Sequence, residues 1–198
     1  MWVLGLWPLA ASAGDARFDA LRAGAQTVDG GLTAFLEQYT GDCGDASNTP
    51  QCRQKADAYR KAAAGRRFYA LLREDAAGMV AFAPGDQAGG DYTVLVTPFF
   101  AGGPHAFTTQ APKKTDARGN PIFPRLALAG VIPEGETDDS VERLFRRRGV
   151  RVEILFTPEA LWSLPRKGEK PLTGCRGRLD ALLVTTGDGA VLARYEPR

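Results

Sequence analysis

Histidine and free cysteine are the residue types in this chain that could carry general-base or nucleophilic chemistry near neutral pH. His105, in the sequence GGPHAF, is the only histidine, and Cys175 stands far along the chain from the other two cysteines. Together they could form a thiol–imidazole dyad, but no local pattern links them. A solvent-facing histidine on a loop is the favoured alternative, so the sequence assigns no catalytic residue.

The motifs of several common enzyme classes are missing. The chain has no Walker-type phosphate loop, no Gly-x-Gly-x-x-Gly, no His-Glu-x-x-His and no Gly-x-Ser-x-Gly. It also has no Cys-x-x-Cys, which excludes a zinc ribbon or a thioredoxin-type site. A lone histidine would need carboxylates or thiolates for every other metal ligand. We therefore expect no metal and no cofactor.

The loop GDASNTPQ is flanked by Cys43 and Cys52. In an oxidising compartment the two thiols could pair, and closing so short a loop would stabilise the fold by roughly 2–3 kcal/mol. Two unrelated thiols are the alternative. Asp42, Asp45 and Asn48 offer oxygen ligands for Ca²⁺, but their spacing differs from that of an EF-hand, and turn chemistry explains them better. The sequence predicts a Cys43–Cys52 disulfide.

A long segment rich in Gly, Pro, Lys and Thr, residues 101–124, carries aromatic residues in and around it. We expect a long loop or the tip of a wide β-hairpin, and structureless loops of this length are usually functional or disordered. Exposed rings there would bind a sugar, a peptide or an apolar ligand, whereas rings at the edge of a core would only pack. Deleting residues 102–120 is expected to spare folding. The candidate binding residues are Phe99, Phe100, His105, Phe107, Phe123 and Trp162.

Five arginines form the densest basic cluster of the chain. They could bind phosphate or an acidic polymer. However, most of them fall at the end of a helix predicted from Asp139 to Gly149, where cations complement the helix dipole, so a solvated face is favoured. The net charge of +2 also disfavours nucleic acid as a partner. The five are Arg143, Arg146, Arg147, Arg148 and Arg151.

The first residues resemble a secretory signal peptide. An apolar run, WVLGLWPL, precedes Ala11-Ser12-Ala13, the small-x-small pattern that predicts cleavage after Ala13. The run is short and lacks a basic residue before it, so a buried N-terminal strand or helix is the alternative. No later stretch approaches the ~18 apolar residues of a membrane span. We expect a periplasmic or secreted protein with no integral membrane segment after signal removal.

Composition places the remainder among globular proteins. Of 198 residues, 44% are hydrophobic and 24% are charged, which excludes a disordered, fibrous or multi-span membrane protein. We predict a signal peptide at 1–13 and one domain at 14–198, with a helical segment at 14–65 and a β-rich segment at 66–198.

Helical periodicity dominates the segment before residue 65. Seven apolar residues at alternating steps of three and four share one helical face, with a kink or break expected at Gly30-Gly31. Thr49 can cap a second helix that has Pro50 in its first turn and ends at Gly65. The seven residues are Phe18, Leu21, Ala25, Val28, Leu32, Phe35 and Tyr39.

Strand-like runs follow from residue 66 onward. Gly187-Asp188-Gly189 predicts a hairpin between the last two runs. A short helical turn is expected from Thr157, with Pro158 in its first turn and Trp162 after it. The predicted strands are 68–72, 79–82, 92–96, 126–132, 150–156, 178–186 and 190–196.

Together these patterns predict an α+β fold. An N-terminal helical hairpin would pack on an antiparallel β-barrel or sandwich, with an OB-like barrel possible and one inserted helix. The Arg-over-Lys bias is typical of a high-GC bacterial chain. We expect an exported, non-enzymatic binding or assembly module whose partner is a protein or a cell-envelope component. The alternative is a secreted hydrolase of unusual type that uses His105 or Cys175.

Overall fold

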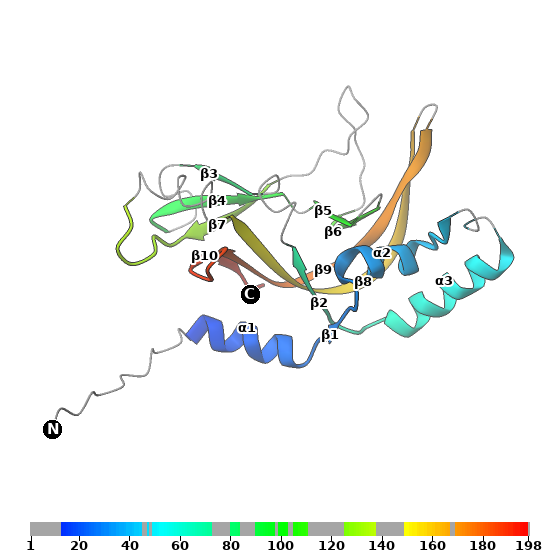
Figure 1. Cartoon of the computed structure of the whole chain (residues 1–198), viewed down its shortest axis with the longest axis horizontal. Coiled ribbons are helices and arrows are strands. Elements are labelled where there is room, and N and C mark those ends of the chain that lie inside the picture. The colour runs from blue at the N-terminus through cyan, green and yellow to red at the C-terminus, as the bar shows by residue number, and fades with distance from the viewer. Residues whose placement is uncertain are drawn as a thin grey trace.

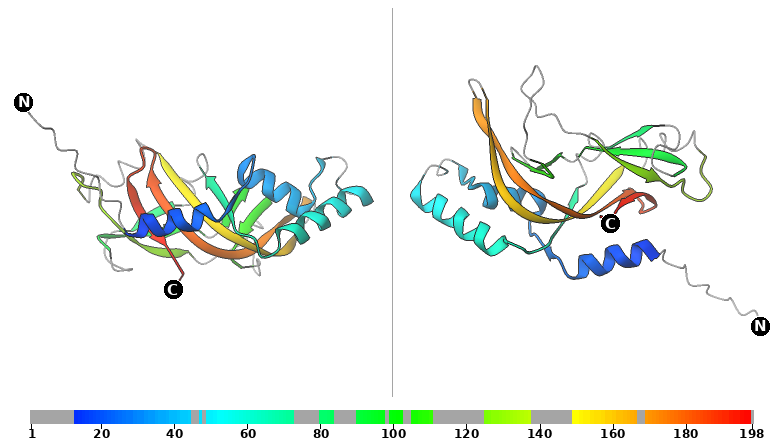
Figure 2. Two further views of the ribbon diagram at one scale, coloured as in Figure 1. Left: turned by 90° about the horizontal axis from the view of Figure 1, so that it is seen from below. Right: turned by 180° about the vertical axis from the view of Figure 1, so that it is seen from behind.

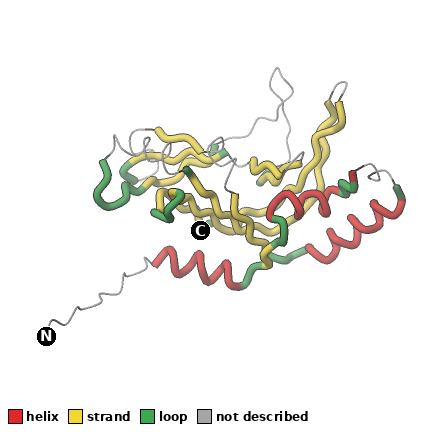
Figure 3. Tube along the Cα trace, viewed as in Figure 1, coloured by secondary structure: helices red, strands yellow, loops and turns green. Residues whose placement is uncertain are grey.

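The computed structural model describes residues 13–44, 47, 49–72, 80–83, 90–97, 99–102, 105–110, 125–137, 149–166 and 169–197. In these residues the chain forms three helices and ten strands, and all the strands belong to one sheet. The fold is therefore mixed α+β, with the helices placed around a single curved layer of strands (Figure 3). Residues 1–12 of the predicted signal peptide 1–13 lie outside the described residues, as does the predicted helix from Asp139.

The sheet is open. Along it the strands follow the order β1-β2-β8-β9-β10-β7-β4-β3. The predicted barrel is wrong, because β1 and β3 at the two ends each pair with a single described neighbour and not with each other. The strands are β1 (Gln26–Thr27), β2 (Phe68–Leu72), β3 (Val80–Ala83), β4 (Tyr92–Val96), β5 (Phe99–Gly102), β6 (His105–Thr108), β7 (Leu126–Gly130), β8 (Val150–Arg166), β9 (Glu169–Thr186) and β10 (Val191–Tyr195).

Strands β8 and β9 are the longest elements, with 17 and 18 residues. One half of this ribbon lies between β2 and β10, and the other half extends from the sheet as an arm (Figure 1). The helical turn predicted at Thr157 is wrong, because Thr157 pairs with Arg178 and the ladder continues to Arg166. Trp162 covers Gly174 in this arm, where a Cβ would collide with its ring.

Helix α2 (Gly31–Thr40) covers one face of the sheet. Its Phe35 and Leu36 are fully buried. The Phe35 ring centroid lies 4.9 Å from that of Phe68 on β2 and 5.0 Å from that of Phe156 on β8. Aromatic pairs at such distances add to the free energy of apolar burial. The main core is therefore a cluster of aromatic and aliphatic side chains between α2 and the sheet.

Helix α1 (Ala13–Ala23) packs on the opposite face, as the side views show (Figure 2). Phe18 is buried there against Tyr69 and Leu155, the neighbours in sequence of the α2-facing residues Phe68 and Ile154. Alternate residues of a strand face opposite ways. The predicted single apolar face is thus divided between two faces of the sheet, because the chain leaves the helix and forms β1 before α2 begins.

Helix α3 (Pro50–Ala63) begins as predicted. The Thr49 hydroxyl accepts a hydrogen bond from the backbone N–H of Cys52 at 3.2 Å, and Pro50 takes the first position. Gly65, just past its end, has a φ of +73°, a backbone conformation that glycine adopts without strain. Helix α3 contacts α2, so the helical segment comprises α1 on one face and the α2–α3 pair on the other.

Most of the predicted strands are confirmed. The ranges 68–72 and 92–96 match β2 and β4, and the runs at 79–82, 126–132, 150–156 and 178–186 coincide with parts of β3, β7, β8 and β9. The predicted hairpin is confirmed too, since β9 and β10 pair antiparallel across Gly187–Gly189.

Candidate functional site

One edge of β9 is interrupted among the described strands. Strand β8 occupies the other edge along its whole length, so β6 and β10 share this one. The parallel pairing of β6 ends at Arg176, and the antiparallel pairing of β10 ends at Leu182. The two strands therefore run toward each other, and no described strand pairs with residues 177–181 on this edge.

A cavity of about 390 Å³ lies at this interruption. Thr109 and Gln110, just past β6, line one side, and Tyr195 and Pro197, at the end of β10, line another. Pro197 has no N–H and cannot extend the β10 ladder. The volume is within the range of about 300–1,000 Å³ that small-molecule sites occupy.

Several polar groups that line the cavity are without a protein partner among the described residues. The guanidinium of Arg125 makes no ion pair or hydrogen bond with them, and neither do the Thr109 hydroxyl, the Gln110 amide or the Tyr195 hydroxyl. Arg125 and Gln110 are exposed, and Thr109 and Tyr195 are half-buried, so these polar groups face solvent and are available to a ligand.

Arg178, on the cavity wall, is held from behind by Asp180. Its Nε donates to Asp180 Oδ1 at 2.6 Å. Asp180 is only 6% exposed, and its Oδ2 accepts from Thr157 Oγ1 at 2.6 Å and from Arg67 Nε at 3.3 Å. Burial alone would raise the pKa of Asp180, but these hydrogen bonds together lower it below its usual value. The hydrogen bond from Arg178 in turn raises the pKa of that guanidinium.

Glu159, the acidic residue on the cavity wall, already has a cationic neighbour. Its Oε2 lies 3.4 Å from Arg176 Nε. Both carboxylates near the cavity, those of Glu159 and Asp180, are therefore paired with arginines, and Arg125 adds a charge that no described carboxylate balances.

His105 is not the solvent-facing loop residue that the sequence favours. It begins β6, and its side chain is 11% exposed. Its Nε2 lies 2.9 Å from Asp42 Oδ2, and its Nδ1 lies 2.7 Å from Thr173 Oγ1. Both ring nitrogens are thus occupied, and neither meets Cys175.

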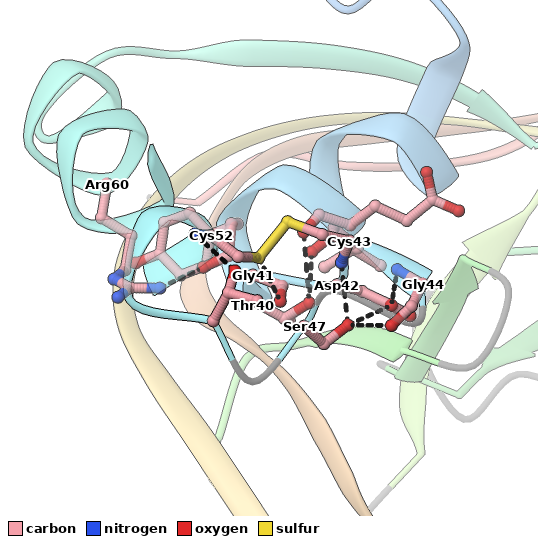
Figure 4. Close-up of a disulfide and its surroundings, with 12 residues drawn as sticks. Thr40, Gly41, Asp42, Cys43, Gly44, Ser47, Cys52 and Arg60 are labelled. Atoms are coloured by element: carbon pink, nitrogen blue, oxygen red, sulfur yellow. Dashed lines mark hydrogen bonds between the residues drawn. A yellow bond between two sulfur atoms is a disulfide. The ribbon is translucent and has the colours of Figure 1, made fainter. Parts of the chain in front are cut away.

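Asp42 is engaged through both carboxylate oxygens. Its Oδ1 accepts from the Gly44 backbone N–H and from Ser47 Oγ, each at 3.0 Å (Figure 4). The hydrogen bond from His105 lowers the pKa of Asp42 most, followed by that from Gly44. Both carboxylate oxygens of Asp42 therefore have described partners, and the other two predicted Ca²⁺ ligands, Asp45 and Asn48, lie outside the described residues.

Cys175 lies in the main core and is fully buried. Burial raises the pKa of its thiol to about 12. A thiol with such a pKa holds almost no thiolate at neutral pH, and the thiolate is the nucleophilic form. The structure therefore does not support a His105–Cys175 dyad, because His105 is bonded to Asp42 and Thr173 and the Cys175 thiol is not ionised at neutral pH.

The predicted aromatic residues divide among three settings. Phe107 is fully buried in the main core, and Trp162 is 7% exposed, so neither presents an open ring. Phe99 and Phe100 belong to β5, which pairs with β6. Phe123 lies outside the described residues, as do the predicted basic-cluster residues except Arg151, which lies in β8.

The predicted disulfide is confirmed. Cys43 and Cys52 are bonded, with their Cα atoms 6.3 Å apart, and the bond joins the end of α2 to the first turn of α3 (Figure 4). A larger hollow of about 520 Å³ lies beside it between α2 and α3. Its lining combines three alanines with the exposed Glu37 and Lys55, its Asp42 is bonded through both carboxylate oxygens, and among the described strands it adjoins no interrupted edge. We therefore place the candidate site at the interruption of β9.

Sequence reasoning missed the cavity residues Arg125, Arg178, Thr109 and Tyr195. One signal pointed near them: Gln110 and Arg125 are the last described residue before and the first after the segment 111–124, and both line the cavity. Residues that flank this part of the predicted binding loop therefore line the candidate site. Deletion of residues 102–120 would remove β6 and the buried Phe107, which argues against the expectation that this deletion spares folding.

Comparisons with known proteins give one match. A family model described as "Family of unknown function (DUF6066)" matches residues 1–193. No curated protein and no solved structure matches the chain. Among the described helices, none combines the length and the apolar character that crossing a membrane requires.

Proposed function

We propose that this chain, which belongs to the DUF6066 family of unknown function, is an exported, non-enzymatic binding protein that takes its ligand into the cavity between β6, β9 and β10. The main observation behind this proposal is the interrupted edge of β9, where a cavity is lined by polar side chains that have no described partner. Polar groups that are hydrogen-bonded within the protein suit a structural role, whereas polar groups that face solvent around a hollow are available to bind a ligand.

Two further features support the proposal. Gln110 and Arg125, the described residues on either side of the segment 111–124, both line the cavity. The Cys43–Cys52 disulfide agrees with an oxidising compartment, as the signal-like N-terminal sequence does.

Export is tested by intact mass of the chain recovered from its native host by cell fraction, without reduction. We expect a chain that begins at Gly14, lies outside the cytoplasm and is lighter than its reduced form by two hydrogen atoms. A full-length, reduced chain in the cytosol would contradict export.

Binding is tested by native mass spectrometry of the same material. We expect a co-purifying ligand that is lost in Thr109→Trp, which fills the cavity, and kept in Gln54→Trp, which adds the same ring to an exposed site on α3. Replacing 111–124 by a short Gly-Ser linker should leave the fold intact and weaken binding. Retention of the ligand by Thr109→Trp would move the site elsewhere.

A secreted hydrolase is the second candidate, and the chain of contacts Asp42–His105–Thr173 favours it. In this arrangement the Thr173 hydroxyl can donate to the imidazole while the imidazole donates to Asp42, which is the order of groups in an activated nucleophile. Labelling of Thr173 by a fluorophosphonate probe, abolished in His105→Ala, would support hydrolysis. Absence of labelling in the wild-type protein would leave the binding role.

A further inference from the structure

We propose that the ligand of this cavity is a small organic acid, whose carboxylate lies between Arg125 and Arg178 and whose apolar body lies against Leu126, Leu179 and Tyr195. The inference rests on the proposed binding function and names its ligand class. It follows from the charge of the lining, from the hydrogen bonds that hold Arg178, and from the apolar residues that line the same cavity.

The charge of the wall favours an anion. Glu159 is paired with Arg176, and Asp180 accepts from both Arg178 and Arg67. Cations therefore exceed carboxylates around the cavity, and the Arg125 guanidinium has no described partner. The Thr109 and Tyr195 hydroxyls add neutral donors. A cationic ligand would meet two arginines and no unpaired described carboxylate.

Arg178 is prepared to bind before a ligand arrives. Its Nε bond to Asp180 fixes the plane of the guanidinium, and its Nη2 makes only a long contact of 3.4 Å with Thr157 Oγ1. The remaining N–H groups are available to an acceptor. A planar guanidinium fixed on one side binds a carboxylate through two parallel hydrogen bonds and loses little entropy.

The apolar residues that line the cavity favour an organic acid over a free inorganic anion as the ligand. Leu126, Leu179 and Tyr195 expose apolar atoms to the same cavity. Phosphate alone would leave this surface uncovered, whereas an acid with an apolar tail would cover it and gain the corresponding free energy of burial. The volume of about 390 Å³ is sufficient for a compact molecule of this kind.

The test compares hexanoate with its neutral analogues hexanamide and 1-hexanol, and with inorganic phosphate, on the full, disulfide-bonded chain. Binding is followed by titration with ¹H–¹⁵N NMR, reading the amides of Gly177, Leu179 and Leu126. We expect hexanoate to shift these amides and to bind at least tenfold more tightly than hexanamide. Arg125→Ala should weaken hexanoate at least tenfold, whereas Arg66→Ala, which removes an exposed arginine that does not line the cavity, should not.

Each other outcome has a distinct meaning. If hexanamide shifts the same amides with equal affinity, the proposal that the ligand is an acid fails, but the proposal that the cavity binds a ligand is kept. If phosphate binds as tightly as hexanoate and is displaced by it, the ligand is an inorganic anion and the apolar half of the proposal fails. If no probe shifts the cavity amides at millimolar concentration, the acid and the cavity both fail. If Arg66→Ala weakens hexanoate binding as much as Arg125→Ala does, the loss reflects the net charge of the protein and not a contact with Arg125.

Discussion

Strand β6 meets two polar regions, one at each end, and they differ in how their groups are bonded. At its first residue, His105 is held by Asp42 and Thr173, and Asp42 is held in turn by Gly44 and Ser47. Just past its last residue, Thr109 and Gln110 face a cavity in which their polar groups have no described partner. Both regions lie beside β9.

The difference separates a structural role from a binding role. Bonded polar groups between two elements stabilise the fold, because breaking them leaves buried donors and acceptors without partners. Groups left open around a hollow contribute little to folding and are available to a ligand. Variants at the His105 end should therefore lower stability, and variants at the cavity end should change binding alone.

Removal of the disulfide should give the largest effect. In Cys43→Ser with Cys52→Ala, the free energy of unfolding is expected to fall by about 2–3 kcal/mol, because the unfolded chain regains the freedom of a short closed loop. Urea denaturation followed by tryptophan fluorescence measures it. Reduction of the wild-type protein should lower the free energy of unfolding by a similar amount. A loss below about 0.5 kcal/mol would show that the disulfide contributes little to the stability of this loop.

Removal of the imidazole should come next. His105→Ala deletes two side-chain hydrogen bonds, one of them to a carboxylate, and is expected to cost about 1–2 kcal/mol in the same assay. Thr173→Val removes only one of them and should cost less. Because the disulfide fixes the loop that carries Asp42, the effect of His105→Ala should shrink in the disulfide-free variant. Strict additivity would show that the two features act independently.

A smaller effect is expected from pH. The pKa of Asp42 is lower in the folded state than its ordinary 3.8, so ionised Asp42 stabilises the fold above that value. This contribution is lost as the pH falls below 3.8 through the lowered pKa. Asp42→Asn should therefore be less stable than wild type at pH 6–7, and the two curves should converge in acid. A difference that stays constant down to acid pH would exclude the carboxylate charge as its source.

The smallest effect on stability is expected at the cavity. Arg125→Ala should change the free energy of unfolding by less than about 0.5 kcal/mol, because its guanidinium has no described partner to lose. The exposed Arg66→Ala is the matched control. A loss above about 1 kcal/mol for Arg125→Ala alone would make Arg125 a structural residue and remove the contrast between the two ends of β6.

Two similar sequence signals show how far local patterns predict this fold. Thr49-Pro50 predicts a helix start, and α3 begins there with the Thr49 hydroxyl as its cap. Thr157-Pro158 carries the same pattern, yet the chain continues as β8. The Thr157 hydroxyl donates to Asp180 on β9 and caps no helix. A partner 23 residues away decides between the two outcomes, and a local pattern does not contain it.

The site was predictable only in part. The Cys43–Cys52 pair follows from spacing and loop composition, because both ends of a short loop are necessarily close. The cavity instead joins the ends of β6 and β10 to β9, which depends on strand pairing between distant segments. Arg125 and Arg178 are ordinary arginines in the sequence, and only the folded structure makes both of them line one cavity.

The order of strand pairing also bears on when this chain can fold. The β8–β9 ribbon closes between Arg166 and Glu169, which needs little loop-closure entropy, whereas β2 and β6 pair with residues far ahead of them in the chain. We expect pulse-labelled hydrogen exchange to show the amides of Ile154 and Leu182 protected before those of Ala70 and Ala106, whose strands pair with this ribbon. Strands β2 and β6 are synthesised before their partners, so they join the sheet only once β8 and β9 have formed.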